Sequence, residues 1–540
     1  MLGELRREQE TLPYATAVAR FSSMQGGLAR EGRYQELLPL AAPGPGEQYH
    51  FEVDLDLCSS CKSCVSACHQ LNGTDPGESW RRVTQLESTK GPYVQALTSA
   101  CHHCLDPACM KGCPVQAYEK DPFTGIVRHL DDQCIGCQYC MMTCPYDVPQ
   151  YNARLGIVRK CDMCSQRLRH GEAPACAQAC PTDAISIKSQ STATLKRQLS
   201  PEHGASGLPL DTVDPSMTGP TTRYKSQRPL PPLHEVKTDT QKIEPAHGPL
   251  VAMLVLSQWA VGLCLMLALL PLLEGAARPA GLMQLLATAT ALLTFASLGL
   301  GTLHLGRPLW AFRALLGLRT SWMSREVLAF GGFAAATLLF ALIHWPELHP
   351  WAAEIGAYED YVLGFLLLSG LGGVLCSVMI YAATRRRCWS FRRTLGRFGG
   401  TSLIMGGVSL LLALSAWLPL SPELLGLAAG TGALVALKLL SELLFLFPRA
   451  GQKDPVFVHS AALLRGPLRL WTSLRMGLGL LGGGSLLAIA YLGAQDQGIP
   501  SELLLFLSGT GLLFLLGGET IERSLFFRSV AYPRLPGAWR

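Results

Sequence analysis

The chain has 540 residues, a formal net charge of +6 and a hydrophobic content of 49%. Sixteen of its 19 cysteines lie between residues 58 and 180, whereas the long apolar runs begin after Pro249, so we expect two functional halves. Most of the arginine surplus falls between apolar runs, where it acts as a membrane-topology signal, and this excludes a nucleic-acid-binding protein.

Residues 1–48 are polar and punctuated by Gly and Pro, and we expect an N-terminal extension with a short helix near Tyr14 to Gly27. The Arg pair near the start has no apolar segment behind it, so it does not fit a secretory or twin-arginine signal. In a chain without such a signal, clustered cysteines more often bind metal than form disulfides. The cysteine-rich region is therefore expected to stay in the cytoplasm and to hold thiolates.

The cysteine-rich region contains four groups of four cysteines. The first and third groups have the spacing C-x2-C-x2-C-x3-C, in which three close thiolates bind one iron–sulfur cube and the fourth binds the neighbouring cube. Zinc normally takes two cysteine pairs per ion and needs no third close cysteine, so zinc and disulfides are the weaker alternatives. Because no ligand position is missing, we predict four [4Fe–4S] clusters. The groups are Cys58, Cys61, Cys64 and Cys68; Cys101, Cys104, Cys109 and Cys113; Cys134, Cys137, Cys140 and Cys144; and Cys161, Cys164, Cys176 and Cys180.

Residues 49–190 are predicted to form a ferredoxin-like α+β domain that its clusters hold together more than an apolar core does. His102 and His103 lie between two ligands, and we interpret them as neighbours of a cluster or surface groups and not as ligands. Residues 191–248 are rich in Pro, Ser and Thr, which predicts an irregular linker or strap.

Residues 249–540 are predicted to form an all-α membrane domain with eight spans, because their apolar runs reach the roughly 20 residues that cross a bilayer. Alternate loops and the C-terminal tail are basic, and the opposite loops are acidic. The positive-inside rule therefore predicts an integral protein of the cytoplasmic (inner) membrane, with both termini and the cysteine-rich domain on the cytoplasmic side. The spans are expected near residues 250–273, 281–303, 326–345, 361–383, 399–419, 423–446, 473–493 and 502–519.

The cysteine groups, followed by the segment DPSMTGPTTRY, resemble the four-cluster electron-transfer subunit of the dimethyl sulfoxide reductase family of molybdenum enzymes. The apolar half resembles the eight-helix anchor of the same enzymes through HLGRP, SREVLA, IYAATRR and GETIERSLFF. These are usually two separate subunits, so they look fused here. The resemblance implies that groups one and four exchange their last cysteines, as do groups two and three. It also implies a separate catalytic subunit with a bis-molybdopterin guanine dinucleotide cofactor.

A quinone site is expected at the cysteine-domain end of the spans. Haem would need paired histidines within the spans, and only His247, His304 and His344 lie in or beside them, so we expect no haem. A quinone, menaquinone or ubiquinone, must then meet the protein near a cluster. His304 ends the second span and Glu326 opens the third on the same side, and such a pair can exchange the protons of a quinone. The matching positions belong to the quinol site of the resembled anchors; the alternatives are a helix-capping His304 and a Glu326 paired with an Arg.

A second candidate site lies within the sixth span, where Lys438 and Glu442 stand one turn apart. Charge inside a membrane is costly and suggests a proton or quinone role. The alternative is that the two side chains neutralise each other. Four further charged residues are expected to form an ion network at the basic face: Arg475, Glu519, Glu522 and Arg523.

The sequence shows no nucleophile constellation, phosphate loop or dinucleotide fingerprint, so the substrate chemistry is expected in another subunit. We predict an electron-transfer and anchor subunit that connects membrane quinone with a molybdopterin catalytic subunit in anaerobic or sulfur-compound respiration. An oxidative sulfite-type quinone reductase complex is one alternative. A proton-translocating respiratory module with another partner is the other.

Overall fold

The computed structural model describes residues 37–88, 93–198, 214–228, 233–235, 243–272, 279–347, 352–418, 420–447, 455–495 and 499–530. The chain divides into two compact units, one of residues Met1–Thr240 with Pro533–Arg540 and one of residues Gln241–Tyr532. The boundary between the units falls within the expected strap of residues 191–248. The helix expected near Tyr14 to Gly27 lies outside the described residues.

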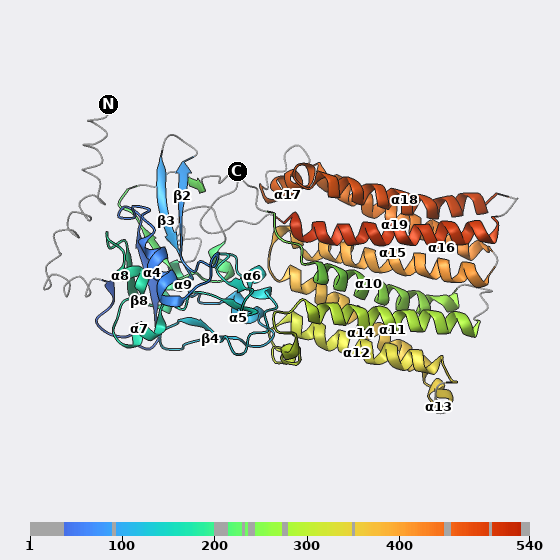
Figure 1. Cartoon of the computed structure of the whole chain (residues 1–540), viewed down its shortest axis with the longest axis horizontal. Coiled ribbons are helices and arrows are strands. Elements are labelled where there is room, and N and C mark those ends of the chain that lie inside the picture. The colour runs from blue at the N-terminus through green and yellow to red at the C-terminus, as the bar shows by residue number, and fades with distance from the viewer. Residues whose placement is uncertain are drawn as a thin grey trace. The chain divides into compact units, whose positions relative to one another are not determined.

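The first unit contains short strands in two three-stranded sheets and two hairpins (Figure 1). Strand β1 lies at the centre of one sheet, antiparallel to β8 and parallel to β9. Because β9 comes from the expected strap, that segment is not wholly irregular. The strands are β1 (Glu47–Asp54), β2 (Arg82–Ser88), β3 (Val94–Ser99), β4 (Tyr118–Lys120), β5 (Val127–His129), β6 (Gln150–Asn152), β7 (Ile157–Arg159), β8 (Ile185–Ser191), β9 (Arg223–Lys225) and β10 (Leu233–Glu235).

The helices of the first unit are short, and several of them carry the cysteines. The apolar core is correspondingly small: Phe51 and Ile187 of the central sheet pack in one cluster with Met163 and with cysteine side chains. The unit is therefore built around its cysteine loops. The helices are α4 (Ser63–Asn72), α5 (Ala108–Gly112), α6 (Tyr139–Thr143), α7 (Ser165–Arg169), α8 (Ala175–Gln178), α9 (Thr192–Gln198) and the 3-10 turn η2 (Pro215–Met217).

The second unit is a bundle of helices, eight of which are long and apolar enough to cross a membrane, so the predicted fold class and the eight spans are confirmed. Some ends differ from expectation, because hydropathy registers the apolar window and misses charged terminal turns. The fifth spanning helix begins at Phe391, and the eighth continues to Arg528. The spanning helices are α10 (Gly248–Leu269), α11 (Ala280–Leu303), α12 (Trp322–Ile343), α14 (Glu359–Ala382), α15 (Phe391–Trp417), α16 (Pro422–Leu446), α18 (Arg469–Gly493) and α19 (Ser501–Arg528).

Helices α10 and α15 form the centre of the bundle, and they are the two most deeply buried of the spanning helices. A Cβ atom added at Gly262 would lie 1.9 Å from the carbonyl oxygen of Ser402, and one at Gly406 would lie 2.3 Å from the carbonyl oxygen of Gly262. The two backbones therefore touch, and only glycine fits at this crossing. Short helices complete the bundle: η3 (Leu270–Leu272), η4 (Pro308–Leu315), α13 (Ala352–Gly356), η5 (Arg387–Trp389) and α17 (Pro455–Arg465).

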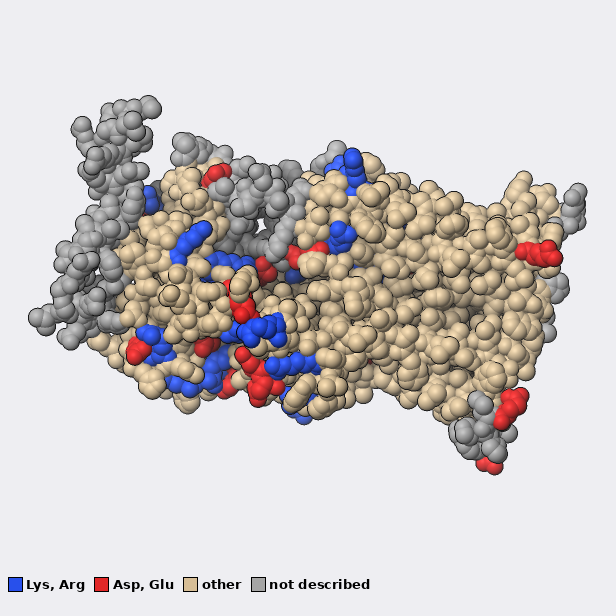
Figure 2. Space-filling view, viewed as in Figure 1, with Lys and Arg blue, Asp and Glu red and all other residues tan. Residues whose placement is uncertain are grey.

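Exposed charges of the second unit gather at the two ends of the bundle, with an uncharged belt between them (Figure 2). One end carries acidic residues, including Glu354 in α13 and Glu359 in the first turn of α14. The other end carries basic residues, including Arg325 in the first turn of α12 and Arg528 in the last turn of α19. This distribution is typical of a membrane-spanning bundle.

Candidate functional site

The fold brings the sixteen cysteines of the four groups into four sets in which the sulfurs influence one another electrostatically. In each set, three cysteines of one group are joined by the last cysteine of another group. These are the sets that the family resemblance implied. They are set A (Cys58, Cys61, Cys64, Cys180), set B (Cys161, Cys164, Cys176, Cys68), set C (Cys101, Cys104, Cys109, Cys144) and set D (Cys134, Cys137, Cys140, Cys113).

Two of the sets each surround a cavity of their own. All four cysteines of set A line one cavity together with Thr98 and Thr182, and all four of set C line another together with His102 and Lys160. Within the described residues, no three His, Cys, Asp or Glu side chains converge closely enough to hold one metal ion.

Three of the exchanged cysteines stand before a proline in a repeated turn. Three residues after each of them, the backbone takes the left-handed conformation that non-glycine residues seldom adopt. The turn returns backbone N–H groups to the sulfur: the Ala117 nitrogen donates to Cys113 Sγ over 3.2 Å. Such donors favour a thiolate ligand. The left-handed residues are Gln116 (φ 54°), Asp147 (φ 53°) and Asp183 (φ 54°).

Burial makes several of these thiols poor acids unless a cation is bound. Burial first, and neighbouring sulfurs to a smaller extent, raise the pKa of Cys58 and of Cys68 to about 11. Burial likewise raises the pKa of Cys164 to about 12. Buried thiols that are costly to ionise alone fit ligands whose charge is compensated by iron.

The four sets follow one another in a row. Cys64 of set A lies near Cys176 of set B, and Cys161 of set B lies near Cys101 of set C. The phenol of Tyr118 lies among sulfurs of both set C and set D, because Cys109 and Cys140 both act on it. The order is therefore A, B, C, D, with each set beside the next.

His102 and His103 are buried, so the surface interpretation of these two residues is wrong. Burial lowers the pKa of His102 to about 3, and it also lowers the pKa of His103. The His102 ring packs edge-on against Tyr146 at 4.5 Å, and His103 Nδ1 accepts a hydrogen bond from the Val127 nitrogen over 3.1 Å. Both imidazoles are neutral groups beside the ligands of set C.

His304 and Glu326 lie at helix ends of the second unit. His304 is the C-terminal cap of α11, and its ring packs edge-on against His247, the N-terminal cap of α10, with 5.0 Å between the centroids. Glu326 is buried in α12 and accepts a hydrogen bond from the Ser377 hydroxyl of α14, not from an arginine. No hydrogen bond or ring contact joins His304 to Glu326 in the described part of the chain.

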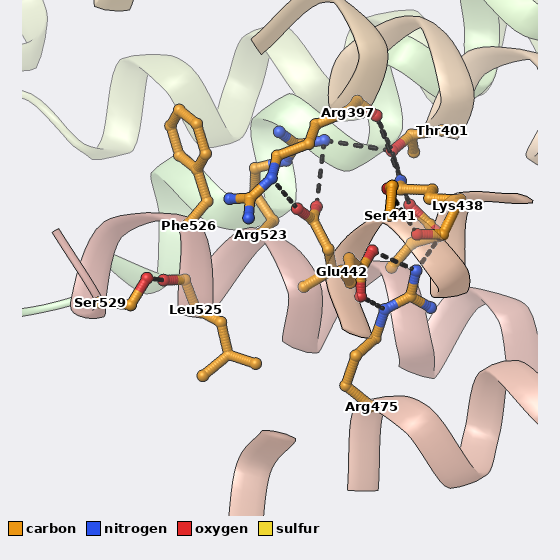
Figure 3. Close-up of polar contacts among 12 residues, drawn as sticks. Arg397, Thr401, Lys438, Ser441, Glu442, Arg475, Arg523, Leu525, Phe526 and Ser529 are labelled. Carbon is orange, nitrogen blue, oxygen red and sulfur yellow. Dashed lines mark hydrogen bonds and ion pairs between the residues drawn. The ribbon is translucent and has the colours of Figure 1, made fainter. Parts of the chain in front are cut away.

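Lys438 and Glu442 do not neutralise each other, so that interpretation is wrong. The Lys438 ammonium donates to Glu519 of α19 and to the Thr401 hydroxyl of α15, the latter over 2.9 Å. Glu442 receives two hydrogen bonds from the Arg475 guanidinium of α18, at 2.9 and 3.1 Å (Figure 3). Each member of the pair is thus held by a different helix.

These contacts belong to one buried ion network. A network was expected for Arg475, Glu519, Glu522 and Arg523, and the structure adds residues of α15 and α16, so that it joins four helices. Arg475 also reaches Glu519 over 3.1 Å, which makes Glu519 the anion shared by two cations. On its other side, Arg523 donates to Gln258 over 2.8 Å and to Thr401 over 3.1 Å, and Arg397 lies 3.4 Å from Glu522. We call Arg397, Lys438, Glu442, Arg475, Glu519, Glu522 and Arg523 the ion network.

A large cavity opens beside the ion network. Lys438 and Glu442 line it together with Arg392, Arg393 and Arg397, and leucine and phenylalanine side chains form much of the rest of its wall. The cavity is lined neither by His304 nor by Glu326. The membrane unit therefore holds two separate candidate sites. One is formed by His304 and Glu326 at helix ends, and the other is the cavity beside the ion network.

The fold and the cysteine sets define a class of protein: an iron–sulfur electron-transfer domain carried on a polytopic membrane anchor. Residues 93–190 match the 4Fe-4S dicluster domain, and residues 246–441 match the DMSO reductase anchor subunit (DmsC). These matches fall on the two units separately.

Known proteins are similar in sequence to the cysteine-rich region of this chain. The B subunit of the anaerobic dimethyl sulfoxide reductase of Haemophilus influenzae is 39% identical over 152 residues, which are 26% of this chain and 73% of the relative. The probable anaerobic dimethyl sulfoxide reductase subunit YnfG of Escherichia coli K12 is 40% identical over 148 residues, 26% of this chain and 72% of the relative. The hydrogenase-2 operon protein HybA of Escherichia coli O157:H7 is 36% identical over 160 residues, 24% of this chain and 49% of the relative.

The chain belongs to the dimethyl sulfoxide reductase family, as its iron–sulfur electron-transfer subunit fused to its membrane anchor. The resemblance predicted from the motifs is confirmed. It is an integral membrane protein.

Proposed function

We propose that this chain conducts electrons between membrane quinone and a separate catalytic subunit, through four [4Fe–4S] clusters bound by sets A, B, C and D. The observation that carries the proposal is the row of sets, because each set has a direct neighbour and a continuous row suits a relay. When bound, a cluster of this kind takes up and releases one electron. The cysteines hold the clusters in sequence.

The proposed catalytic partner is a molybdopterin subunit with bis-molybdopterin guanine dinucleotide, which fits the family and the lack of substrate-binding motifs in this chain. The basic end of the bundle and the cysteine-rich unit are proposed to face the cytoplasm, because basic loops stay on that side. The proton-coupling alternative has less support, since the Lys438 ammonium and the Glu442 carboxylate are both held by other helices of the ion network.

We propose His304 and Glu326 as the quinone site. The imidazole of His304 is half-buried at the end of α11, and the Glu326 carboxylate is buried one turn inside α12. An imidazole and a carboxylate can each accept a proton, so the pair suits the two protons that leave a quinol with its two electrons. His247 holds the His304 ring, and Ser377 holds the carboxylate.

Replacing His304 with Ala is expected to block the reduction of the clusters by quinol and to leave their reduction by dithionite unchanged. The measurement is electron paramagnetic resonance of the four-iron signals, on membranes that contain the whole complex. His344→Ala is the matched control, because His344 caps the opposite end of α12, where its Nε2 lies 3.5 Å from Glu359. If quinol reduces the His304 variant like the parent, the quinone binds elsewhere, and the cavity beside Lys438 is the next candidate.

Replacing Glu326 with Gln is expected to slow quinol oxidation by about 100-fold, which is the lower end of what a general base contributes. The amide keeps the shape and still accepts the Ser377 hydrogen bond, so the loss reports the proton-accepting role. Stopped-flow reduction of the clusters by quinol measures it, with Glu359→Gln at the acidic end of the bundle as the control. An unchanged rate in Glu326→Gln would remove this carboxylate from the site.

A further inference from the structure

Arg81 is a fully buried cation whose anionic neighbours are cysteine sulfurs. Arg81 directly precedes β2 in the chain and is 1% exposed. Neighbouring sulfurs of sets A and B hold its charge: those of Cys64 in set A and of Cys68, Cys161 and Cys176 in set B. Within the described residues it forms no ion pair with a carboxylate. Arg81 therefore stands at the junction between set A and set B.

The surroundings of Arg81 fix the guanidinium in place. Its Nη1 donates to the Thr98 hydroxyl over 3.1 Å, and that hydroxyl lies 3.6 Å from Cys64 Sγ. The guanidinium carbon lies 4.6 Å from the centre of the Phe51 ring. The Nε and Nη2 atoms are buried and have no hydrogen-bond partner among the described residues.

An arrangement of this kind requires a counter-charge. A buried ion without compensation costs several kcal/mol, and each buried donor without an acceptor adds to that cost. A four-iron cluster with four thiolate ligands carries a net negative charge and exposes sulfur atoms that accept hydrogen bonds. The orphaned donors of Arg81 and the missing counter-charge are both explained by clusters in set A and set B.

A second buried cation, Lys160, lies at the next junction. It is 3% exposed, and its ammonium donates to the carbonyl oxygens of Val127 and Cys161, the latter over 2.9 Å. The sulfurs that act on it are those of Cys101 and Cys109 in set C and of Cys161 in set B. The Asp162 carboxylate also acts on Lys160, while it accepts hydrogen bonds from the Cys164 nitrogen and the Ser165 hydroxyl.

We propose that Arg81 and Lys160 are built-in counter-ions of the relay, Arg81 raising the reduction potentials of the clusters in sets A and B and Lys160 those in sets B and C. This rests on the proposed function, because it requires the clusters. Reduction adds one electron to a cluster, and a fixed positive charge in a low-dielectric interior stabilises the reduced form more than the oxidised form. The cluster of set B lies beside both cations and gains from both.

The test is a potentiometric titration of the four-iron signals by electron paramagnetic resonance, on the whole complex in membranes. Arg81→Gln is expected to lower the reduction equilibrium constant of two clusters by about tenfold or more, which is about 59 mV for a one-electron step. Lys160→Gln is expected to do the same to two clusters, one of which also moves in Arg81→Gln. The cluster of set D moves in neither variant.

Arg154→Gln is the matched control, because Arg154 is 66% exposed and forms its ion pair with Asp75 at 3.0 Å, away from the four sets. It is expected to leave all four titrations in place. Arg81→Lys keeps the charge and is expected to retain potentials near those of the parent, which keeps the proposal testable if Arg81→Gln binds less iron. Four titrations unchanged in both Gln variants would overturn the counter-ion proposal. Fewer than four four-iron clusters in the parent would instead overturn the proposed function.

Discussion

Replacing Glu519 with Gln is expected to lower the free energy of unfolding of the membrane unit by about 3–5 kcal/mol, the usual cost of breaking a buried ion pair. Glu519 is fully buried and is the anion shared by Lys438 and Arg475. The ion network holds four cations and three carboxylates, so losing this carboxylate leaves Lys438 without its anion and leaves Arg475 with Glu442 alone. SDS-induced unfolding of the detergent-solubilised protein measures the loss.

Glu502→Gln is the control for this prediction, because Glu502 is an exposed residue in the first turn of the same helix, α19. Adding Lys438→Met to Glu519→Gln is expected to recover part of the lost stability, since it removes the cation that has lost its anion. Equal stability of the Glu519 and Glu502 variants would show that the network does not hold the helices together. A double variant weaker than Glu519→Gln would show that Lys438 stabilises the bundle through other contacts.

Local features of the sequence predicted the cysteine groups and the eight spans, because both depend on spacing over at most about 25 residues. The exchange of Cys68 and Cys180 between groups required the family resemblance, since no spacing rule fixes which of several distant loops meet. The structure brings the first and fourth groups together through β1 and β8, whose pairing of Val53 with Ile185 places the loop after β1 and the loop before β8 at one end of the sheet.

Side-chain partners were the part that the sequence did not predict. The spacing of Lys438 and Glu442 suits a pair within one helix, but α18 and α19 offer each of them a partner with better geometry. The role of Arg81 was also invisible, because Arg81 and Arg82 are adjacent and only one of them faces the interior of the unit. Which of the two is buried follows from how the sheet of β2 and β3 packs on the cysteine loops.

Removing the iron is expected to unfold residues 47–198 and to leave the eight spanning helices folded. Of the ten non-glycine residues with positive φ in the described chain, nine lie between Ser60 and Asp183, within or next to the cysteine loops. Each such residue costs about 1–3 kcal/mol and persists only where the surroundings impose it. The short helices and small sheets of this unit supply little compensation, so the bonds from sulfur to iron are the main source of its stability.

Hydrogen–deuterium exchange of the whole protein, before and after anaerobic chelation, tests this directly, because peptides from both units are followed in one sample. We expect the protection of β1 and β8 to disappear while that of α10 and α15 stays, since the contact of Gly262 with Ser402 and the ion network do not involve iron. Protection of β1 and β8 that survives complete iron loss would show that the apolar packing of Phe51 and Ile187 suffices for this unit. In that case the left-handed residues of the cysteine loops are held by the polypeptide itself, and the loops are preformed for the clusters.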